Sequence, residues 1–385
     1  MATATSPRSQ GPSAVGGIGA PPERRCRAPS PPRGRGSKRR SARASEARSV
    51  GRKRRASRFH GVLVVDKPRG PTSHDVVARV RRAFDTGAVG HAGTLDPMAT
   101  GVLVVAVGEG TKLVAYLTAA DKEYEATLTL GAVTDSLDAD GKVVAEAPIP
   151  ALSLDAVAEA AQTFVGAGKQ VPPKFSAIKV GGRPLYERAR KGEEVEVPER
   201  DVFVHALEVA RATGDEVDFR VRAAKGFYVR SLGRDIAVAL GTVGHLTALR
   251  RTASGAFGLA GAVPMALVEA AAGGDPAARG ELEAALLPLT TAWRGPRATL
   301  DQEGVVDARH GRRVQPMNVL ERTPGDPESR GEVMALLDQA GEMVALARED
   351  EAECLAIVRG FVSQVVSQSV PQVVPDRVDT GDGRG

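Results

Sequence analysis

The order of the apolar segments constrains the fold of this chain more than any other feature of its sequence. Strands are predicted at 61–66, 102–107, 124–130 and 246–251 and as a pair within 202–221, and helices are predicted at 73–84, 153–165 and 228–240. Several of these strands follow one another without an intervening helix. Because a doubly wound parallel sheet needs a regular alternation of strands and helices, this order favours an α+β fold.

The two ends of the chain lack this periodicity. Residues 1–58 hold 16 Lys and Arg against Glu23 and Glu46, a net charge of +14, whereas the remainder has 36 basic and 45 acidic residues, a net charge of −9. A segment with almost no large apolar side chains cannot bury enough surface to offset its ordering entropy, so we expect 1–58 to be disordered. Its charge suits an arm that attracts RNA, and the alternatives are a solvated extension or a start codon assigned too early. Residues 363–385 are expected to be a disordered tail.

Local sequence signals predict the turns, the helix cap and the boundaries between the folded parts of the chain. The turn signal at 67–71 precedes Ser73, which we expect to be the N-cap of the first helix. The stretch 270–280 is rich in Ala and Gly and is interpreted as a boundary region. After it, short strands at 333–337, 343–348 and 355–358 predict a small β-rich module. We therefore expect a main domain at 59–288 and a C-terminal module at 289–362.

Composition excludes several classes of protein. Cys26 and Cys354 supply neither a disulfide framework nor a set of zinc ligands, and two cysteines fit a reducing cytoplasm. The six histidines form no H-E-x-x-H motif, so no metal site is predicted. His205 and His245 are interpreted as structural and His310 as a surface residue. No apolar run approaches the roughly 20 residues of a membrane helix, and no secretory signal is evident.

The densest cluster of polar and glycine residues is GHAGTLDPMATG at 90–101, between two apolar segments. Glycines allow a backbone to approach a ligand closely, and the proline that follows Asp96 restricts the backbone that carries this carboxylate. Catalytic groups are often found on such loops. From composition alone, a tight structural turn with a capping aspartate is the stronger alternative.

Three further clusters carry polar side chains. AKGFYVR at 224–230 places Lys225, Tyr228 and Arg230 at intervals that suit contact with a phosphate or carboxylate, or simply an ordinary strand with surface cations. Tyr124 begins a strand and could equally be a half-buried packing residue. The basic stretch that includes Lys179 and Arg183 could follow a phosphate backbone or keep a loop soluble.

Taken in order, seven motifs of this chain resemble the bacterial tRNA pseudouridine-55 synthase (TruB) family, which is related to guide-dependent enzymes of archaea and eukaryotes. They are GVLVVDKPRGPTS at 61–73, VGHAGTLDP at 89–97 with TGVL at 100–103, KEY at 122–124, PPKFSA at 172–177, KGFYVRSL at 225–232 and LRRT at 249–252. The resemblance covers roughly residues 59–257. It implies a pseudouridine synthase catalytic domain, with a mixed, largely antiparallel sheet and flanking helices.

The resemblance also implies a chemistry that uses neither a metal nor a cofactor. The N1–C1′ bond of a uridine breaks, the base rotates, and it rejoins the ribose through C5. Asp96 matches the essential carboxylate, which attacks either C1′ of the ribose or C6 of the base. Arg230 matches the arginine that pairs with it, and such a pair is expected to hold Asp96 ionised by lowering its pKa.

Further roles follow from the resemblance. Tyr124 matches a tyrosine that stacks on the flipped base, and Tyr228 matches a second active-site tyrosine. His91 matches a histidine that lies against the everted region, and Lys225, Lys179 and Arg183 are expected to contact RNA. Lys67 and Pro68 match a motif that supports the catalytic loop.

Two parts of the chain depart from the family pattern. Ser136 stands where threonine is expected, and the region after about residue 290 matches only loosely, although 333–362 could be an RNA-binding module of the PUA type. The expected function is isomerisation of a T-loop uridine, position 55, by a monomer that binds the T arm of tRNA without an obligatory protein partner and without contact with a membrane. The alternatives are a guide-RNA-dependent synthase and a tRNA chaperone.

Overall fold

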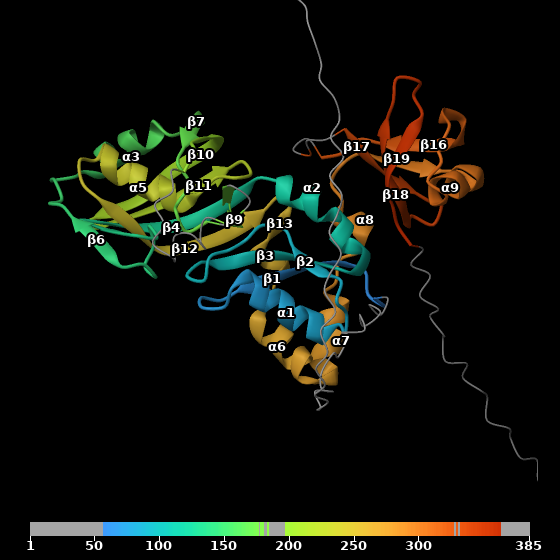
Figure 1. Ribbon diagram of the computed structural model, residues 1–385, viewed down its shortest axis with the longest axis horizontal. Helices are drawn as coiled ribbons and strands as arrows, with labels where there is room; N and C mark the ends of the chain where they lie inside the picture. The colour runs from blue at the N-terminus through green and yellow to red at the C-terminus, as the bar shows by residue number, and fades with distance from the viewer. Residues whose placement is uncertain are drawn as a thin grey trace, which may run out of the picture. The chain divides into compact units, whose positions relative to one another are not determined.

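The computed structural model describes residues 57–176, 178–180, 183–184, 197–326, 329 and 332–362 (Figure 1). Almost all of the basic segment 1–58, and the whole of the segment 363–385, lie outside the described residues, as do the side chains of Lys179 and Arg183. The expectations of disorder at the two ends therefore stay predictions. No helix in the described part of the chain is both long enough and apolar enough to cross a membrane.

A ten-stranded mixed sheet forms the larger part of the fold. Its strands run in the order β14-β1-β3-β12-β4-β11-β10-β7, with β2 added on β3 and β13 on β12. They are β1 (Gly61–Lys67), β2 (Val89–His91), β3 (Thr100–Val107), β4 (Lys122–Leu130), β7 (Gly166–Gln170), β10 (Arg200–Thr213), β11 (Glu216–Ala223), β12 (Gly244–Ser254), β13 (Phe257–Gly258) and β14 (Val263–Pro264). Only the β1–β14 and β12–β3 pairings are parallel. The prediction of an α+β fold with a largely antiparallel sheet is confirmed.

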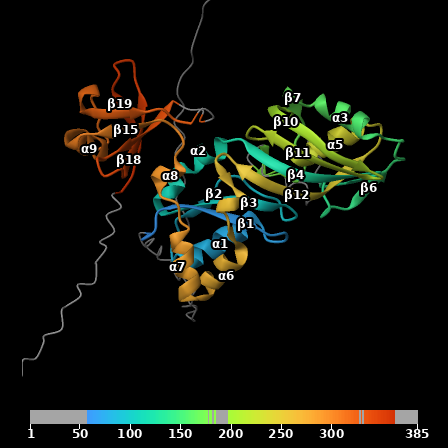
Figure 2. The same ribbon diagram turned by 180° about the vertical axis from the view of Figure 1, so that it is seen from behind.

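Helices cover one face of this sheet in two groups. One group is α1 (Ser73–Ala83), α6 (Met265–Gly273) and α7 (Pro276–Ala284), and the other is α3 (Leu154–Gln162) and α5 (Val229–Ala239). Two further helices, α2 (Val114–Ala119) and α8 (Leu289–Ala292), contribute instead to a second core on the opposite face. Figure 2 shows α1, α6 and α7 side by side at one end and α3 with α5 at the other. Both groups bury their apolar residues in the same core as alternate residues of the strands, for example Leu63 and Val65 of β1. The first core of the molecule therefore lies between one face of the sheet and these helices.

The opposite face of β1 and β3 forms a second core. Val62, Val64, Val102 and Val104 face this way because successive side chains of a strand alternate between the two faces. They share a cluster with Trp293, whose indole N–H donates to the Pro296 carbonyl at 3.0 Å.

Within the described residues, two small hairpins stand apart from the ten-stranded sheet. They are β5 (Ala132–Thr134) with β6 (Val143–Glu146), and β8 (Lys179–Val180) with β9 (Arg183–Pro184).

The interpretation of 270–280 as a boundary region is wrong, because this stretch lies in α6 and α7. Gly274 ends α6 in a left-handed conformation with φ +100°, and Asp275 caps α7 by accepting from the Ala277 and Ala278 amides. Ala271 and Ala278 are buried in the first core. Small side chains here allow close packing between helices, which composition alone does not distinguish from a linker.

The N-cap of the first helix lies one residue earlier than predicted. Thr72, not Ser73, is the N-cap of α1, and it forms a capping box with Asp75. The buried Ser73 hydroxyl instead accepts from the Leu95 amide at 2.8 Å and donates to the Leu95 carbonyl at 3.1 Å. The start of α1 is thereby attached to the loop 92–99, which joins β2 to β3.

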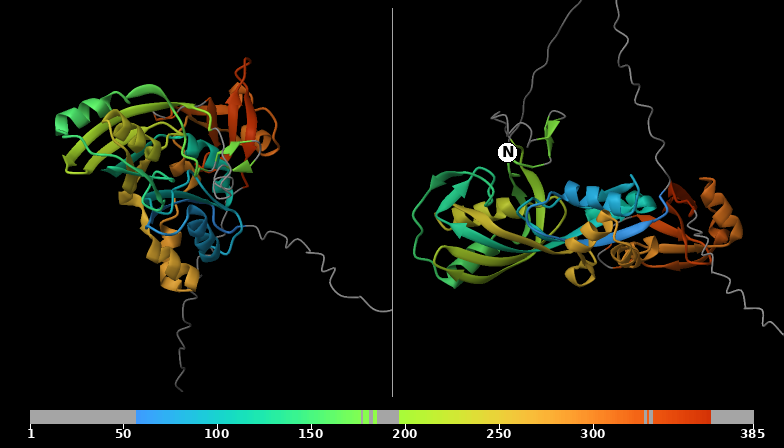
Figure 3. Two further views of the ribbon diagram at one scale, coloured as in Figure 1. Left: turned by 60° about the vertical axis from the view of Figure 1, so that its left-hand side comes forward. Right: turned by 90° about the horizontal axis from the view of Figure 1, so that it is seen from below.

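The C-terminal part forms a separate five-stranded sheet in the order β16-β15-β17-β18-β19, coloured orange to red in Figure 3. Its elements are β15 (Arg297–Leu300), α9 (Gln302–Arg309), β16 (Val319–Thr323), β17 (Val333–Leu337), β18 (Met343–Glu349) and β19 (Leu355–Gly360). The three strands predicted from the sequence are confirmed, whereas β15, α9 and β16 were not foreseen. His310 follows α9 and is exposed, as predicted.

Candidate active site

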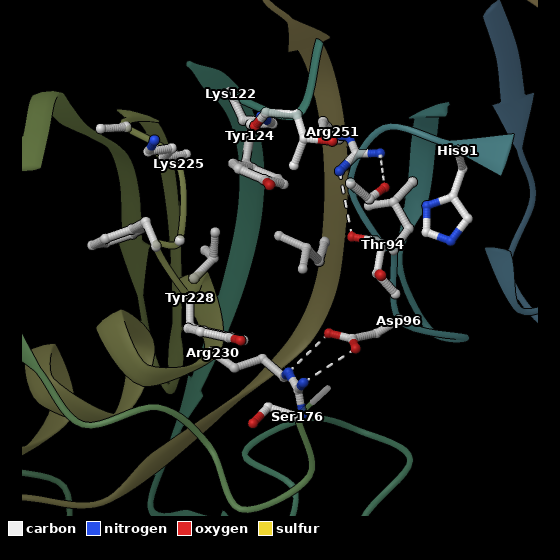
Figure 4. A pocket seen from close by; sticks show the side chains of 18 residues that line it. His91, Thr94, Asp96, Lys122, Tyr124, Ser176, Lys225, Tyr228, Arg230 and Arg251 are labelled. Carbon is white, nitrogen blue, oxygen red and sulfur yellow. Dashed lines mark hydrogen bonds and ion pairs between the residues drawn. The ribbon is translucent and has the colours of Figure 1, made fainter. Parts of the chain in front are cut away.

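A cavity of about 450 Å³ opens on the helix-covered face of the large sheet (Figure 4). Its lining comes from the loop 91–96, from β4 and β12, and from the connection between β11 and α5. The residues that carry polar side chains into it are His91, Thr94, Asp96, Thr118, Lys122, Tyr124, Ser176, Lys225, Tyr228, Arg230 and Arg251. Six of the residues singled out from the sequence therefore meet at one place.

Asp96 and Arg230 form a two-pronged ion pair at the wall of this cavity. The Arg230 Nε lies 2.9 Å from one carboxylate oxygen of Asp96, and a terminal nitrogen donates to the other at 3.1 Å. Arg230 lies in the first turn of α5 and is 4% exposed. Two parallel bonds fix the orientation of a carboxylate as well as its position. The loop that carries Asp96 is thus locked against α5.

Arg230 has a second carboxylate partner that the sequence did not single out. Asp138, which is almost fully buried, lies 3.2 Å from a terminal nitrogen of Arg230. The same guanidinium donates to the carbonyls of Ser136 and Phe175 at 2.8 and 3.0 Å. Ser136, which stands where threonine was expected, retains a hydroxyl that donates to the Asp138 carboxylate at 2.5 Å. Asp138 belongs to the segment TDSLD at 134–138, whose similarity to the family pattern was the available signal.

The environment of Asp96 shifts its pKa upward. Burial raises the pKa of the Asp96 carboxyl above its ordinary value and the nearby Asp138 adds to the rise, whereas Arg230 opposes it. About 33% of the side chain stays exposed, and the remainder is buried. The expectation that pairing lowers this pKa is therefore corrected: loss of hydration outweighs the effect of Arg230.

Lys67 supports the loop of Asp96 through hydrogen bonds to main-chain carbonyls. Its side chain is fully buried at the end of β1, and Nζ donates to the carbonyls of Pro68, Pro71 and Pro97 at 2.9, 2.9 and 3.3 Å. Pro97 directly follows Asp96, and its carbonyl also accepts from the Gly70 amide at 2.8 Å. Pro68 itself is exposed and takes part through its carbonyl. Burial lowers the pKa of Lys67 to about 8.

The two tyrosines approach the cavity from different elements. Tyr124 projects from β4, and Tyr228 occupies the N-cap position of α5. The buried Gln170 of β7 holds the Tyr228 main chain from both sides: its amide oxygen accepts from the Tyr228 N–H at 2.9 Å, and its amide nitrogen donates to the Tyr228 carbonyl at 3.1 Å. Burial raises the pKa of the Tyr228 phenol. Figure 4 shows both phenols directed into the cavity near Asp96.

The expected RNA-contacting residues lie at the margins. His91, in β2, packs edge-to-face against the exposed His74 of α1 with ring centroids 5.3 Å apart. Burial lowers the pKa of His91, and His74 and Arg251 lower it further. Lys225 is exposed at the opposite rim. Lys179 and Arg183 lie in β8 and β9, and their side chains are outside the described part.

Two buried cations of the lining were not assigned a role from the sequence. Lys122, at the start of β4, donates to the carbonyls of Thr118 and Ala120 at 2.6 and 2.5 Å, and burial lowers its pKa to about 8. Arg251, in β12, donates to three main-chain carbonyls around the loop of Asp96. Both residues belong to motifs that were recognised in the sequence, but nothing in those motifs indicates burial. No group of three or more potential metal-binding side chains occurs within the described residues.

Comparison with known proteins identifies the family. Residues 81–229 match the model of the TruB family pseudouridylate synthase N-terminal domain, and residues 230–293 match that of the tRNA pseudouridylate synthase B C-terminal domain. The tRNA pseudouridine synthase B of Opitutus terrae is 50% identical over 210 residues, which are 54% of this chain and 87% of that protein. The chain belongs to the TruB family. The synthase B of Mycobacterium sp. strain KMS is 44% identical over 284 residues, which are 72% of this chain and 92% of the relative.

Solved structures of other proteins are similar in fold to this chain. A Cbf5-Nop10-Gar1 complex is similar with a TM-score of 0.63 and 27% identity, over 80% of this chain and 87% of the other. An H/ACA RNP bound to a substrate RNA containing 2′-deoxyuridine gives a TM-score of 0.60 and 26% identity over the same shares. The TruB models span the lining from His91 to Arg251, whereas Lys67 precedes the matched residues.

Proposed function

We propose that this chain is a tRNA pseudouridine synthase that isomerises the T-loop uridine at position 55, with Asp96 as its nucleophile and without a guide RNA. The observation that carries the proposal is the geometry of Asp96. It is the only carboxylate lining the cavity among the described residues, and it is held by two bonds to a buried arginine. The relatives at 44–50% identity are named tRNA pseudouridine synthase B.

The lining residues suit the isomerisation. An ionised Asp96 attacks the ribose at C1′ or the base at C6, and the fork to Arg230 keeps the carboxylate aimed at the ring. Tyr124 stacks on the base, and its phenol lies near the site where the C5 proton must leave. Tyr228 closes the cavity beside Arg230. The rise in the pKa of Asp96 caused by burial leaves a more basic and more nucleophilic carboxylate than one in water.

The substrate uridine must leave its loop to reach Asp96. A cavity of about 450 Å³ accommodates one everted nucleotide, and eversion costs a few kcal/mol. We assign His91 to the space beside the everted nucleotide and Lys225 to a phosphate at the opposite rim. Lys179 and Arg183 are assigned to the RNA backbone on the strength of their charge and the family resemblance alone.

The remaining parts of the proposal concern the chain as a whole. We assign residues 59–288 to the catalytic domain and 289–362 to an RNA-binding module of the PUA type. The chain acts as a monomer in the cytoplasm and needs no protein partner. The division into two domains is supported by the change from the ten-stranded to the five-stranded sheet, which begins at Arg297.

One observation favours a second candidate function. The structural neighbours at 26–27% identity come from a Cbf5-Nop10-Gar1 complex and an H/ACA RNP, so this fold also operates within a ribonucleoprotein. A synthase of that kind would be inactive on tRNA without added RNA and proteins. The higher identity to the synthase B relatives favours the stand-alone enzyme.

The test is release of tritium from unmodified tRNA labelled at uridine C5, with neither guide RNA nor added metal. We expect release by the wild type and none by Asp96→Asn, which should still bind tRNA because Arg230 keeps Asp138 as a partner. Asp218→Asn, on the solvated face of β11, is the matched control and should retain activity. No release by a folded wild type that binds tRNA would reject the stand-alone enzyme, and product mapping outside the T loop would reject position 55.

A tRNA chaperone is separated from the enzyme by the same variant. If Asp96→Asn refolds misfolded tRNA as fast as the wild type, refolding does not require the chemistry, and the two activities coexist in one chain.

A further inference from the structure

Arg251 is a buried cation with an unusual set of partners. It is 1% exposed, and among the described residues its guanidinium is bonded to main-chain carbonyls rather than to a carboxylate. Nε donates to Val102 at 2.7 Å, and the two terminal nitrogens donate to Gly93 at 3.1 Å and to Thr94 at 3.4 Å. Figure 4 shows this side chain reaching from β12 toward the loop beside Thr94. Because a buried charge is costly unless it is well bonded, these three contacts indicate a specific structural role for the Arg251 side chain.

The main chain of Arg251 meets the same loop at its other end. Arg251 is paired with Gly101 where β12 runs parallel to β3. Gly101 has φ +100°, and a Cβ at this position would lie 2.2 Å from the Arg251 carbonyl oxygen. Only glycine therefore permits this approach. On its other side, Arg251 is paired with Tyr124 of β4.

One residue thus contacts the loop on both sides of Asp96. Its side chain bonds Gly93 and Thr94 before the nucleophile, and its main chain and Nε meet Gly101 and Val102 after it. We propose that Arg251 is a positioning residue that clasps the two ends of this loop and sets the Asp96 carboxylate relative to the ring of Tyr124. The proposal deepens the proposed function, because the reaction it serves is the isomerisation assigned to Asp96.

The geometry requires a guanidinium rather than a positive charge. The guanidinium of arginine presents donors from three nitrogens in one plane and reaches three carbonyls at once. The ammonium of lysine is a single compact nitrogen and cannot span these carbonyls. A lysine at position 251 would leave carbonyls of the loop unpaired and the loop free to shift. Displacement of a reacting group by about 1 Å can slow a reaction roughly 100-fold.

The experiment compares Arg251→Lys with the wild type on saturating tRNA in single turnover, together with the Kd for tRNA. We expect the rate of the chemical step to fall about 10- to 100-fold while the Kd stays within about twofold. Arg220→Lys is the matched control: this arginine is 66% exposed on β11 and pairs with Glu125 at 3.1 Å on the opposite face of the sheet. A wild-type rate for Arg251→Lys would overturn the proposal. A loss confined to Kd would overturn it too, because Arg251 would then be an RNA ligand.

Hydrogen exchange provides a second arm that does not depend on how well the variant folds. In the wild type, the amides of 93–99 should exchange as slowly as those of β3, because the clasp makes the loop open together with its strands. Exchange as fast as in the exposed turn 213–216 would overturn the clasp. In a folded Arg251→Lys variant, exchange at 93–99 should rise at least about tenfold while α3 is unchanged, and equal exchange would also overturn it. An inactive wild type would reject the proposed function while leaving the exchange result to decide the clasp.

Discussion

Buried side chains around Asp96 show how burial and charge act against each other in this site. Lys67 and Lys122 each donate to carbonyls of the main chain, and burial lowers the pKa of both to about 8. Burial raises the pKa of Asp96 for the same reason, since a charged group loses its water. Lys67 partly offsets that rise by its charge. The loop of Asp96 is supported by Lys67 and Arg251, whose bonding partners are backbone atoms, which leaves Arg230 to orient the nucleophile.

The acidic limb of the pH–rate profile should depend on Asp138, the carboxylate near Asp96. The reaction needs ionised Asp96, so the rate should rise as the pH passes upward through its raised pKa. Asp138 contributes to that rise by repulsion, and Asp138→Asn should therefore move the acidic limb to lower pH while slowing the maximal rate about 10-fold or more through a less constrained Arg230. Single-turnover rates between pH 4.5 and 8 provide the measurement, at about half-unit intervals. An acidic limb that stays in place or moves to higher pH would contradict this account.

The stability of the fold should depend on Lys67 in a defined range of pH. Its pKa is about 8 in the folded protein, whereas the ordinary value of 10.5 applies to the unfolded chain. The unfolded chain therefore binds the proton more tightly. Folding stability contributed by Lys67 should therefore increase as the pH rises from about 8 toward 10.5. We expect the free energy of unfolding of the wild type, measured relative to Lys67→Met by urea denaturation, to increase between pH 7.5 and 9.5. A difference that is constant or falls with pH would show that the lysine is not desolvated.

At the scale of single elements, the start of α1 shows how a helix can serve a loop. The capping function belongs to Thr72 and Asp75, which leaves the Ser73 hydroxyl available to bond both main-chain groups of Leu95. Leu95 immediately precedes Asp96. The helix therefore holds the catalytic loop at the residue next to the nucleophile, and a displacement of α1 would reach Asp96 through one residue.

Ser73→Ala should weaken both the fold and the chemistry. The change leaves a buried N–H and a buried carbonyl of Leu95 without a partner, which should cost about 1–3 kcal/mol of stability. Loosening of the loop should also slow the chemical step several-fold. Ser153→Ala removes the corresponding hydroxyl from the N-cap of α3, which bonds the Ala156 amide at 3.1 Å, and should cost about 1 kcal/mol with no change in rate. Urea denaturation and single-turnover assays separate the two variants, and equal rates for both would disprove the link through Leu95.

Over the whole molecule, charge is distributed unevenly between the parts. The first 58 residues carry +14, and the remainder carries −9 although it contains the candidate active site. Within the cavity, however, the cations outnumber the single lining carboxylate. Local positive charge thus comes from a few residues placed by the fold, and we propose that long-range attraction for RNA resides in the N-terminal segment.

Removal of residues 1–56 should reduce the salt dependence of tRNA binding more than it reduces catalysis. Each phosphate contact made by a basic residue steepens the dependence of log K on log salt by roughly 0.7 to 0.9. The truncated protein should therefore show a shallower slope and weaker binding at low salt, with an unchanged single-turnover rate at saturation. Binding titrations at about 50 to 300 mM salt test this. Identical slopes for both proteins would assign the segment no role in RNA attraction.

Much of the site is readable from the sequence because its residues lie in short, ordered motifs. Asp96, Arg230, Tyr124 and Tyr228 were all expected at the site, and the alternation of apolar residues predicted most of the strands that place them. Periodicity fails where composition is ambiguous: the Ala- and Gly-rich stretch that forms α6 and α7 resembles a linker, although its small residues allow helices to pack closely.

By itself, the sequence determined which elements form and which motifs carry polar groups, since these depend on neighbours along the chain. Only the tertiary structure decided that Asp138 shares Arg230 with Asp96, that burial raises the pKa of the nucleophile, and that Arg251 contacts both ends of its loop. Those contacts join residues 92 to 158 positions apart in the chain. The contacts of Arg251 exist because β12 lies between β3 and β4 in the sheet, and strand order is fixed by packing of the whole domain rather than by any local pattern.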